Sequence, residues 1–269
     1  MTTQYHLKIK EGDIAPYVLL PGDPGRVSII ASTWDKAEKV AENREYVTFT
    51  GTYRGVPITC TSTGIGAPST SIAMEELARC GATTFLRVGT CGTFLDEVAN
   101  GDMAIFDSAM RLDGSSRAYA PIEYPAVAHY KVVQSAVLAA ERLGFPYHVG
   151  ITRSADTFYA SHPRPGSSFN NFYQSWWAGQ FDDYERLNVL AAEMEASVIF
   201  VLARAWRLRA GGISVVLDNV RHVSGDVGVF DPQAQVDHSA DHVERLAVLA
   251  NETIYELHNL DKRSPSHVS

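Results

Sequence analysis

Two short apolar runs in this chain each end in a glycine-rich polar segment, and this repeated pattern constrains the fold more than any other feature. Residues 17–20 lead into Gly22-Asp23-Pro24-Gly25, and residues 83–86 lead into Arg87 and the segment 89–92. Apolar runs of this length, bounded by turn residues, are typical of buried strands. Open α/β sheets bind their ligands at strand ends. The pattern therefore predicts an α/β fold with a ligand site where these two strands end.

Three arginines lie in small, polar or glycine-containing surroundings and are candidates for binding an anion. Arg87 ends a buried strand, where a guanidinium needs a carboxylate partner or an anionic ligand. The Gly89-Thr90-Cys91-Gly92 segment after it can offer backbone N–H groups and a hydroxyl to a phosphate. Taken alone, Arg87 fits one half of an ion pair better than a ligand-binding residue, and Arg26 and Arg44 fit surface residues better still. The residues by themselves leave both interpretations open.

Length and composition restrict the class of protein. A chain of 269 residues with 45% hydrophobic and 20% charged residues suits one globular α/β domain, which we expect to span residues 1–269. The net charge of −8 argues against nucleic acid or an anionic membrane as a partner. Cys60, Cys80 and Cys91 are an odd set without metal-ligand spacing, which favours reduced thiols. Because there is no signal-peptide core and no apolar run of about 20 residues, we expect a cytoplasmic protein.

Turn residues and hydrophobic periodicity divide the chain into strands and helices. We expect a central mixed sheet flanked by helices, without an internal repeat. A long insertion at 160–187, rich in Pro, Ser and aromatic residues, is typical of a functional lid or a covered surface. We expect a loop at 219–236 and a disordered tail from Asn259. The expected strands are 17–20, 46–53, 56–62, 83–88, 103–106, 148–152, 188–192 and 212–217, and the expected helices are 27–32, 70–80, 127–143, 195–207 and 238–258.

Five motifs resemble those of the nucleoside phosphorylase-I family, in particular its uridine-cleaving members. The similarity runs from His6 to the closing helix and so covers nearly the whole chain. It implies a three-layer, phosphorylase/hydrolase-like α/β fold. It also implies reversible phosphorolysis of a nucleoside, in which phosphate attacks the anomeric carbon of ribose and the free base leaves. The motifs are Leu20-Pro21-Gly22-Asp23-Pro24-Gly25-Arg26, Ser62-Thr63-Gly64-Ile65-Gly66-Ala67-Pro68-Ser69-Thr70-Ser71-Ile72, Phe85-Leu86-Arg87-Val88-Gly89-Thr90, Arg111-Leu112-Asp113-Gly114 and Ala155-Asp156-Thr157-Phe158-Tyr159.

The resemblance implies a phosphate site beside a ribose site. Guanidinium groups can bind and align a phosphate dianion, and a carboxylate near the sugar ring can stabilise a cationic transition state, so Arg87 and Glu195 would be catalytic. From the residues alone, Glu195 also fits an acid at a helix N-terminus. Phosphate would be held by Gly22, Arg26, Arg87 and Thr90, with Arg44 from a neighbouring subunit. Ribose would be held by Met194 and Glu195, with His6 from a neighbouring subunit.

The expected base site departs from the uridine pattern at its polar end. The resemblance assigns the base to Cys91, Gly92, Phe158, His162 and Arg164, with Phe158 stacking on the ring. Arg164 matches the pattern and can donate to a base carbonyl. His162 replaces a glutamine, whose amide offers a donor and an acceptor together. An imidazole offers both only from different positions, so selectivity for uracil is not fixed by these residues.

The segment Asp218-Asn219-Val220-Arg221 leaves pyrimidine and purine bases open. An aspartate followed three residues later by an arginine matches purine-cleaving relatives, and an acid there can protonate a leaving purine, so Asp218 would be catalytic. Cys91 is also a purine-like residue. Alternatively, Asn219 keeps the uridine register and Asp218 only caps the loop. The central sequence and the insertion favour uridine or a related pyrimidine nucleoside, with a purine nucleoside as the alternative.

The same resemblance bears on competing activities and on components of the site. A nucleosidase of this fold would use water and would not need the three arginines, and a non-catalytic nucleoside-binding protein would lack some of the phosphate and ribose residues. We expect no organic cofactor and no catalytic metal, because phosphate is itself the nucleophile. Some relatives bind a monovalent cation such as K⁺ between subunits, at positions that match Glu45, Ile65 and Ser69. The family also implies a homo-oligomer, a hexamer built from dimers.

Overall fold

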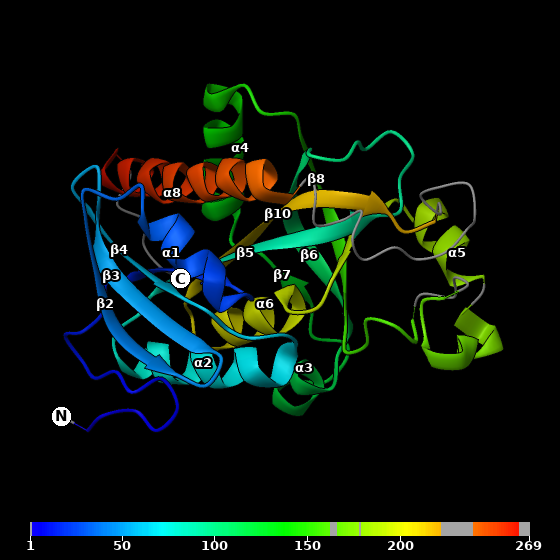
Figure 1. Cartoon of the computed structure of the whole chain (residues 1–269), viewed down its shortest axis with the longest axis horizontal. Helices are drawn as coiled ribbons and strands as arrows, with labels where there is room; N and C mark the ends of the chain where they lie inside the picture. The colour runs from blue at the N-terminus through cyan, green and yellow to red at the C-terminus, as the bar shows by residue number, and fades with distance from the viewer. Residues whose placement is uncertain (1, 162–165, 178, 222–238, 264–269) are drawn as a thin grey trace.

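The protein folds into three layers, with a mixed β-sheet between two layers of helices. The computed structural model describes residues 2–161, 166–177, 179–221 and 239–263. Figure 1 shows helices α1 (Pro24–Ala31), α4 (Tyr130–Leu143) and α8 (Ser239–Arg263) on one face of the sheet. Helices α2 (Ala67–Arg79), α3 (Gly114–Tyr119) and α6 (Ala196–Ala205) cover the other face, and α5 (Gln180–Arg186) lies at one end of the molecule. The expected three-layer α/β architecture is confirmed.

In the described part of the chain, ten strands form one sheet, part of which closes on itself. The order is β10-β6-β8-β9-β5-β1-β4-β3-β2, with β7 paired to β6 and a second pairing between β10 and β5. This second pairing closes β10, β6, β8, β9 and β5 into a five-stranded barrel, while the other main strands extend from β5 as an open sheet. The strands are β1 (Tyr17–Pro21), β2 (Lys36–Asn43), β3 (Tyr46–Tyr53), β4 (Val56–Thr61), β5 (Thr84–Thr93), β6 (Met103–Leu112), β7 (Ala126–Val127), β8 (Tyr147–Ala155), β9 (Val189–Glu193) and β10 (Arg209–Asn219).

β5 pairs with both parallel and antiparallel strands, and this arrangement positions the cavity. β1, β4, β5 and β10 run parallel to their neighbours in this group, whereas β9 pairs antiparallel with β5 and places Ala192 opposite Gly92. The residues that follow Ala192 therefore run back along β5 towards its middle. As a result, the acidic end of β9 lies beside the arginine of β5.

Apolar side chains fill both faces of the sheet. One core cluster lies under α2 and α6 and includes Met74 and Phe200, and another lies under α1, α4 and α8 and includes Leu249. A smaller cluster packs α5 against the end of the barrel, where the rings of Phe94 and Tyr184 lie 5.2 Å apart between centroids. All three cysteines are buried and unpaired. Among the described residues, no helix is long and apolar enough to cross a membrane.

Several expected boundaries are wrong: β5 and β6 continue to Thr93 and Leu112, well past the expected ends at 88 and 106, and two other boundaries differ because tertiary contacts override local pattern. Residues 126–127 form β7 rather than the start of a helix, and α4 begins after His129, whose side chain accepts a hydrogen bond from the Lys131 N–H at 3.3 Å. The tail expected from Asn259 is instead helical as far as Arg263. The Arg209 guanidinium donates to Asp261 at 2.6 Å, which anchors this end of α8 to β10.

Several elements in the described part of the chain fall where the sequence predicted none. β2 is a polar edge strand, KAEKVAEN, with mostly exposed side chains, so it lacks the alternation that reveals a strand. α3 is short and begins at the cap Asp113. The insertion at 160–187 contains α5 rather than loop alone. Residues 222–236 of the expected loop lie outside the described residues.

Candidate active site

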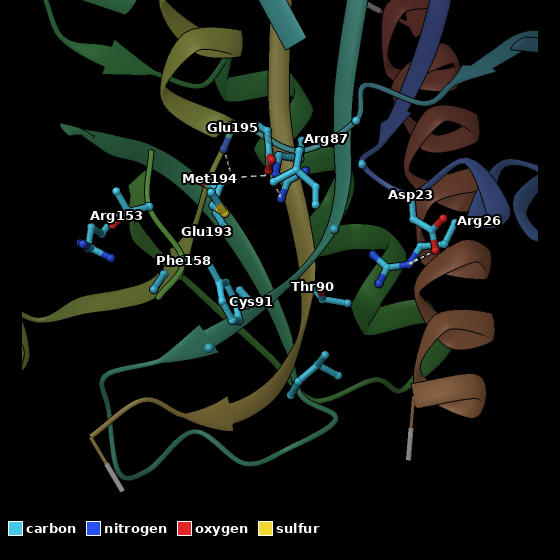
Figure 2. A pocket seen from close by; sticks show the side chains of 18 of the residues that line it. Asp23, Arg26, Arg87, Thr90, Cys91, Arg153, Phe158, Glu193, Met194 and Glu195 are labelled. Atoms are coloured by element: carbon cyan, nitrogen blue, oxygen red, sulfur yellow. Dashed lines mark hydrogen bonds and ion pairs between the residues drawn. The ribbon is translucent and has the colours of Figure 1, made fainter. Parts of the chain in front are cut away.

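A cavity of about 830 Å³ opens at the strand ends that the sequence singled out (Figure 2). This volume is in the range of small-molecule sites. Its wall is built from residues at or just after the ends of β1, β4, β8, β9 and β10 and from the second half of β5. Of the predicted site residues, it gathers Gly22, Arg26, Arg87, Thr90, Cys91, Gly92, Phe158, Met194, Glu195 and Asp218.

Arg87 is held between two buried carboxylates. Its Nε donates to Glu193 Oε2 at 2.6 Å, and its Nη2 lies 2.5 Å from Glu195 Oε2. The antiparallel register of β9 on β5 creates this cluster, since it returns both acids along β5 towards Arg87. Gly89 leaves room for the guanidinium, because a Cβ at that position would lie 2.8 Å from Arg87 Nη2. Arg87 is therefore an ion-pair member, as one interpretation of the sequence expected, and it also lines the cavity.

Burial and charge act in opposite directions on this cluster. Burial lowers the pKa of Arg87, but Glu195 and Glu193 outweigh it and raise the pKa above its ordinary value. For Glu195, burial raises the pKa of the carboxyl and Glu193 adds to this effect, whereas Arg87 and the Gly66 N–H oppose it. When both carboxylates are ionised, they and the one guanidinium carry a net negative charge next to the cavity. Such a charge can stabilise a sugar that becomes cationic.

Glu195 is presented to the cavity rather than used to cap its own helix. It occupies the position before α6, but its side chain makes no capping hydrogen bond to that helix. Instead, its Oε1 accepts a hydrogen bond from the Gly66 N–H at 2.6 Å. Gly66 adopts a φ of 91°, a left-handed conformation that favours glycine. Glu195 therefore lies at a helix N-terminus, as the alternative interpretation expected, and its carboxylate also belongs to the cavity wall.

Glu193 is the residue that caps α6, and the sequence analysis did not single it out. Its Oε2 accepts hydrogen bonds from the N–H groups of Glu195 at 2.7 Å and Ala196 at 2.9 Å, and its Oε1 accepts one from the Ser154 hydroxyl. An acid at the end of an apolar strand was the available signal, because a buried carboxylate needs partners in the same way as Arg87. Glu193 positions both Arg87 and the start of α6.

Arg26 forms the opposite side of the cavity (Figure 2). It lies in the first turn of α1, which Asp23 caps by accepting a hydrogen bond from the Gly25 N–H at 2.8 Å. Its Nε is 4.0 Å from Asp23 Oδ2, so this ion pair is loose. Burial lowers the pKa of Arg26, and the positive charge of Arg87 acts in the same direction. Two guanidiniums that repel each other across one cavity are suited to sharing an anion.

An aromatic ring, a thiol and a buried acid are among the groups at the other end of the cavity. Phe158 is 42% exposed, so its ring is available to a ligand. Asp218 is buried, and a Cβ at Gly92 would lie 2.8 Å from its Oδ1, so the missing side chain of Gly92 makes room for the carboxylate. Burial raises the pKa of the Cys91 thiol well above its usual range, with Glu193 adding to this effect. Cys91 is therefore a neutral wall residue.

The purine-like spacing at Asp218 does not bring Arg221 to the cavity wall. Arg221 pairs with Glu185 of α5 at 2.6 Å and with Asp96 at 3.1 Å. The Asn219 side chain donates to the carbonyl of Leu95 at 3.2 Å. Of the segment 218–221, Asp218 and Val220 line the cavity.

Two predicted residues lie outside the cavity wall of this chain. Arg44 is exposed, in the turn between β2 and β3, with a φ of 55°. His6 binds Glu76 on α2 through Nδ1 at 2.8 Å. The predicted cation-site residues Glu45, Ile65 and Ser69 all line the cavity. His162 and Arg164 lie outside the described residues, and the described part of the chain contains no cluster of His, Cys, Asp and Glu suited to a metal ion.

The fold and the cavity together define an α/β enzyme whose site combines arginines with buried carboxylates. The chain belongs to the phosphorylase superfamily, whose sequence profile matches residues 16–252. The membership expected from the motifs is thus confirmed.

Individual relatives cover most of the chain. It is 50% identical to a uridine phosphorylase from Thermococcus kodakarensis over 216 residues, which cover 80% of this chain and 77% of the relative. It is 38% identical to the uridine phosphorylase of Escherichia coli over 80% of this chain and 85% of the relative. It is also 41% identical to a guanosine phosphorylase from Halorubrum lacusprofundi over 91% of this chain and 95% of the relative.

Proposed function

We propose that this protein catalyses the reversible phosphorolysis of uridine or a related pyrimidine nucleoside, giving the free base and ribose 1-phosphate. The observation that carries the proposal is one cavity in which Arg26 and Arg87 lie across from each other while Glu195 lies against Arg87. The two uridine phosphorylase relatives support the choice of base.

The reaction places phosphate between the two arginines and ribose against Glu195. A phosphate oxygen forms the new bond to the anomeric carbon, the carbon–nitrogen bond breaks, and its electron pair leaves with the base. Arg26 and Arg87 bind and align the phosphate dianion, and the Thr90 hydroxyl and the Gly22 backbone complete the phosphate-binding site. The Glu195 carboxylate accepts hydrogen bonds from the ribose hydroxyls and stabilises the developing positive charge, while Met194 packs against the sugar.

The site is completed by a second copy of the chain. Arg44 and His6 lie outside the cavity wall of their own chain, as expected of residues that act in a neighbouring subunit. Arg44 would reach the phosphate and His6 the 5′-hydroxyl of that neighbour, within a hexamer built from dimers. A monomer with full activity at the assay concentration would contradict this part of the proposal.

A purine nucleoside is the second candidate substrate, and Asp218 favours it. This acid is buried in the cavity wall next to Gly92, where it can protonate a leaving purine. The guanosine phosphorylase relative supports the same alternative. A nucleosidase or a non-catalytic binding protein is disfavoured, because the cavity contains both the arginines and the carboxylate that phosphorolysis requires.

The test is a cleavage screen with and without phosphate. Uridine, thymidine, guanosine, inosine and adenosine are incubated with the protein, base release is followed, and the sugar product is identified by phosphorus NMR. We expect uridine to be cleaved only with phosphate and to yield ribose 1-phosphate. Equal cleavage without phosphate, giving free ribose, would identify a nucleosidase. Nucleoside binding without turnover at any phosphate concentration would identify a binding protein.

A further inference from the structure

Arg153 is a second buried arginine in the cavity wall, and neither the motifs nor the mechanism above uses it. It lies on β8, two residues before the last residue of the strand, and is 1% exposed. Its Nε and Nη2 have no hydrogen-bond partner among the described residues. Arg87 offers a direct contrast, because two carboxylates bind these same two nitrogens of its guanidinium.

The surroundings of Arg153 are aromatic rather than acidic. Its guanidinium carbon lies 5.4 Å from the ring centre of Trp177 and 5.7 Å from that of Tyr184. Burial lowers the pKa of Arg153, and the Tyr184 hydroxyl and the more distant Glu193 oppose this only in part. An arginine nevertheless keeps its proton in proteins. The cavity wall therefore carries a positive charge whose N–H donors are only partly satisfied.

The two unpaired nitrogens form one edge of the guanidinium. Their N–H groups point in nearly the same direction, so this edge can bind one carbonyl oxygen or two adjacent acceptors. Arg153 lies towards Phe158 and far from Arg26 (Figure 2). With phosphate at Arg26 and ribose at Glu195, the part of a nucleoside that extends towards Phe158 is the base.

We propose that Arg153 recognises the carbonyl oxygen at position 4 of a pyrimidine base or position 6 of a purine base, so that the cavity selects bases with an oxo group at this position over those with an amino group. The inference rests on the proposed function, because it assumes a nucleoside in the cavity. A guanidinium only donates hydrogen bonds, so it matches the carbonyl oxygens of uracil or of a 6-oxopurine. The amino group of cytosine or adenine is itself a donor, so it cannot accept a hydrogen bond from the guanidinium of Arg153. Uridine and guanosine share this carbonyl, so the proposal holds for both candidate substrates.

The test replaces Arg153 with methionine, which keeps a long apolar stem, and separately with lysine, which keeps the charge but not the paired edge. Values of kcat/KM are measured for uridine and cytidine and for inosine and adenosine. For Arg153→Met, we expect a loss of at least about tenfold for uridine and inosine, little change for the amino nucleosides, and an unchanged KM for phosphate. Arg153→Lys should not restore the selectivity. Arg26→Ala is the matched control, because it should weaken phosphate binding without changing the preference for oxo bases.

A structural role for Arg153 predicts a different result. If the guanidinium only supports Trp177 and Tyr184, both variants would lose activity equally on all four nucleosides, and the proposal would be overturned. Arg153→Lys provides the measurement if Arg153→Met does not fold.

Direct binding separates this inference from the proposed function. Uracil, hypoxanthine, cytosine and adenine are titrated into the wild type and both variants in phosphate buffer. Even in a protein without turnover, we expect the wild type to prefer uracil and hypoxanthine and the Arg153 variants to lose that preference. A wild type that binds none of the four bases, or variants that keep the preference, would refute the role of Arg153.

Discussion

Replacing Arg26 with alanine should remove phosphate-dependent activity while leaving the fold intact. The side chain of Arg26 is 21% exposed, and its ion pair with Asp23, which is 58% exposed, has a separation of 4.0 Å. Exposed or loose ion pairs of this kind contribute about 0–1 kcal/mol, so the free energy of unfolding should fall by no more than about 1 kcal/mol. The loss of one preorganised charge donor from a reacting anion costs about 3–4 kcal/mol, which corresponds to roughly 10²–10³-fold in kcat/KM for phosphate.

The assay measures both quantities on the same preparation. Initial rates are recorded over a range of phosphate concentrations at saturating uridine, and stability is measured by urea unfolding. Arg79→Ala is the control, because Arg79 forms an ion pair with Glu75 at 2.8 Å on the exposed face of α2, away from the cavity. It should change neither quantity appreciably. An Arg26→Ala variant with wild-type phosphate dependence, or with a loss of activity no larger than its loss of folded protein explains, would refute the role of Arg26.

Three further predictions follow from the buried acids. Glu193→Ala should lower the free energy of unfolding by about 3–5 kcal/mol, because it leaves the charge of Arg87 without its Nε partner and uncaps α6, and a change below about 1 kcal/mol in urea unfolding would contradict this. Burial raises the pKa of Glu76, but hydrogen bonds from Leu7 and His6 outweigh it and lower the pKa below 4.5. The contribution of Glu76 to stability is therefore present above pH 4.5 and is lost as the pH falls through the lowered value. The difference in free energy of unfolding between wild type and Glu76→Gln should shrink in acid. A difference that stays constant with pH would be inconsistent with this. Asp218→Asn should impair purine cleavage and barely affect uridine, and equal losses in kcat/KM would make Asp218 structural.

The sequence predicted the strands that combine apolar content with clear boundaries. Residues 46–53 and the strand that ends at Thr61 were found because β-branched and aromatic residues flank a two-residue turn. β2 was missed because an exposed edge strand can be built from charged residues. The end of α8 was missed because a contact with Arg209, far away in the sequence, stabilises it. The local sequence pattern predicts which residues are buried, but it does not predict contacts between residues far apart in the sequence.

The same limit applies to the cavity. The sequence predicted that Arg87 needs an anionic partner, but it did not show that Glu193 and Glu195 both supply one. That arrangement depends on the antiparallel register of β9 on β5, which local periodicity does not encode. Arg153 gave no signal because it lies in an otherwise ordinary strand, two residues before the motif at 155–159 and not within it. Only the structure shows that this guanidinium is buried and that two of its nitrogens have no hydrogen-bond partner among the described residues.

A crystal structure with bound ligands tests the account most directly. Pseudouridine, whose carbon–carbon glycosidic bond cannot be phosphorolysed, is soaked together with inorganic phosphate. We predict a phosphate ion within about 3 Å of guanidinium nitrogens of both Arg26 and Arg87, with the ribose hydroxyls on Glu195. A nucleoside that occupies the cavity while phosphate binds elsewhere, or binds neither arginine, would contradict the account.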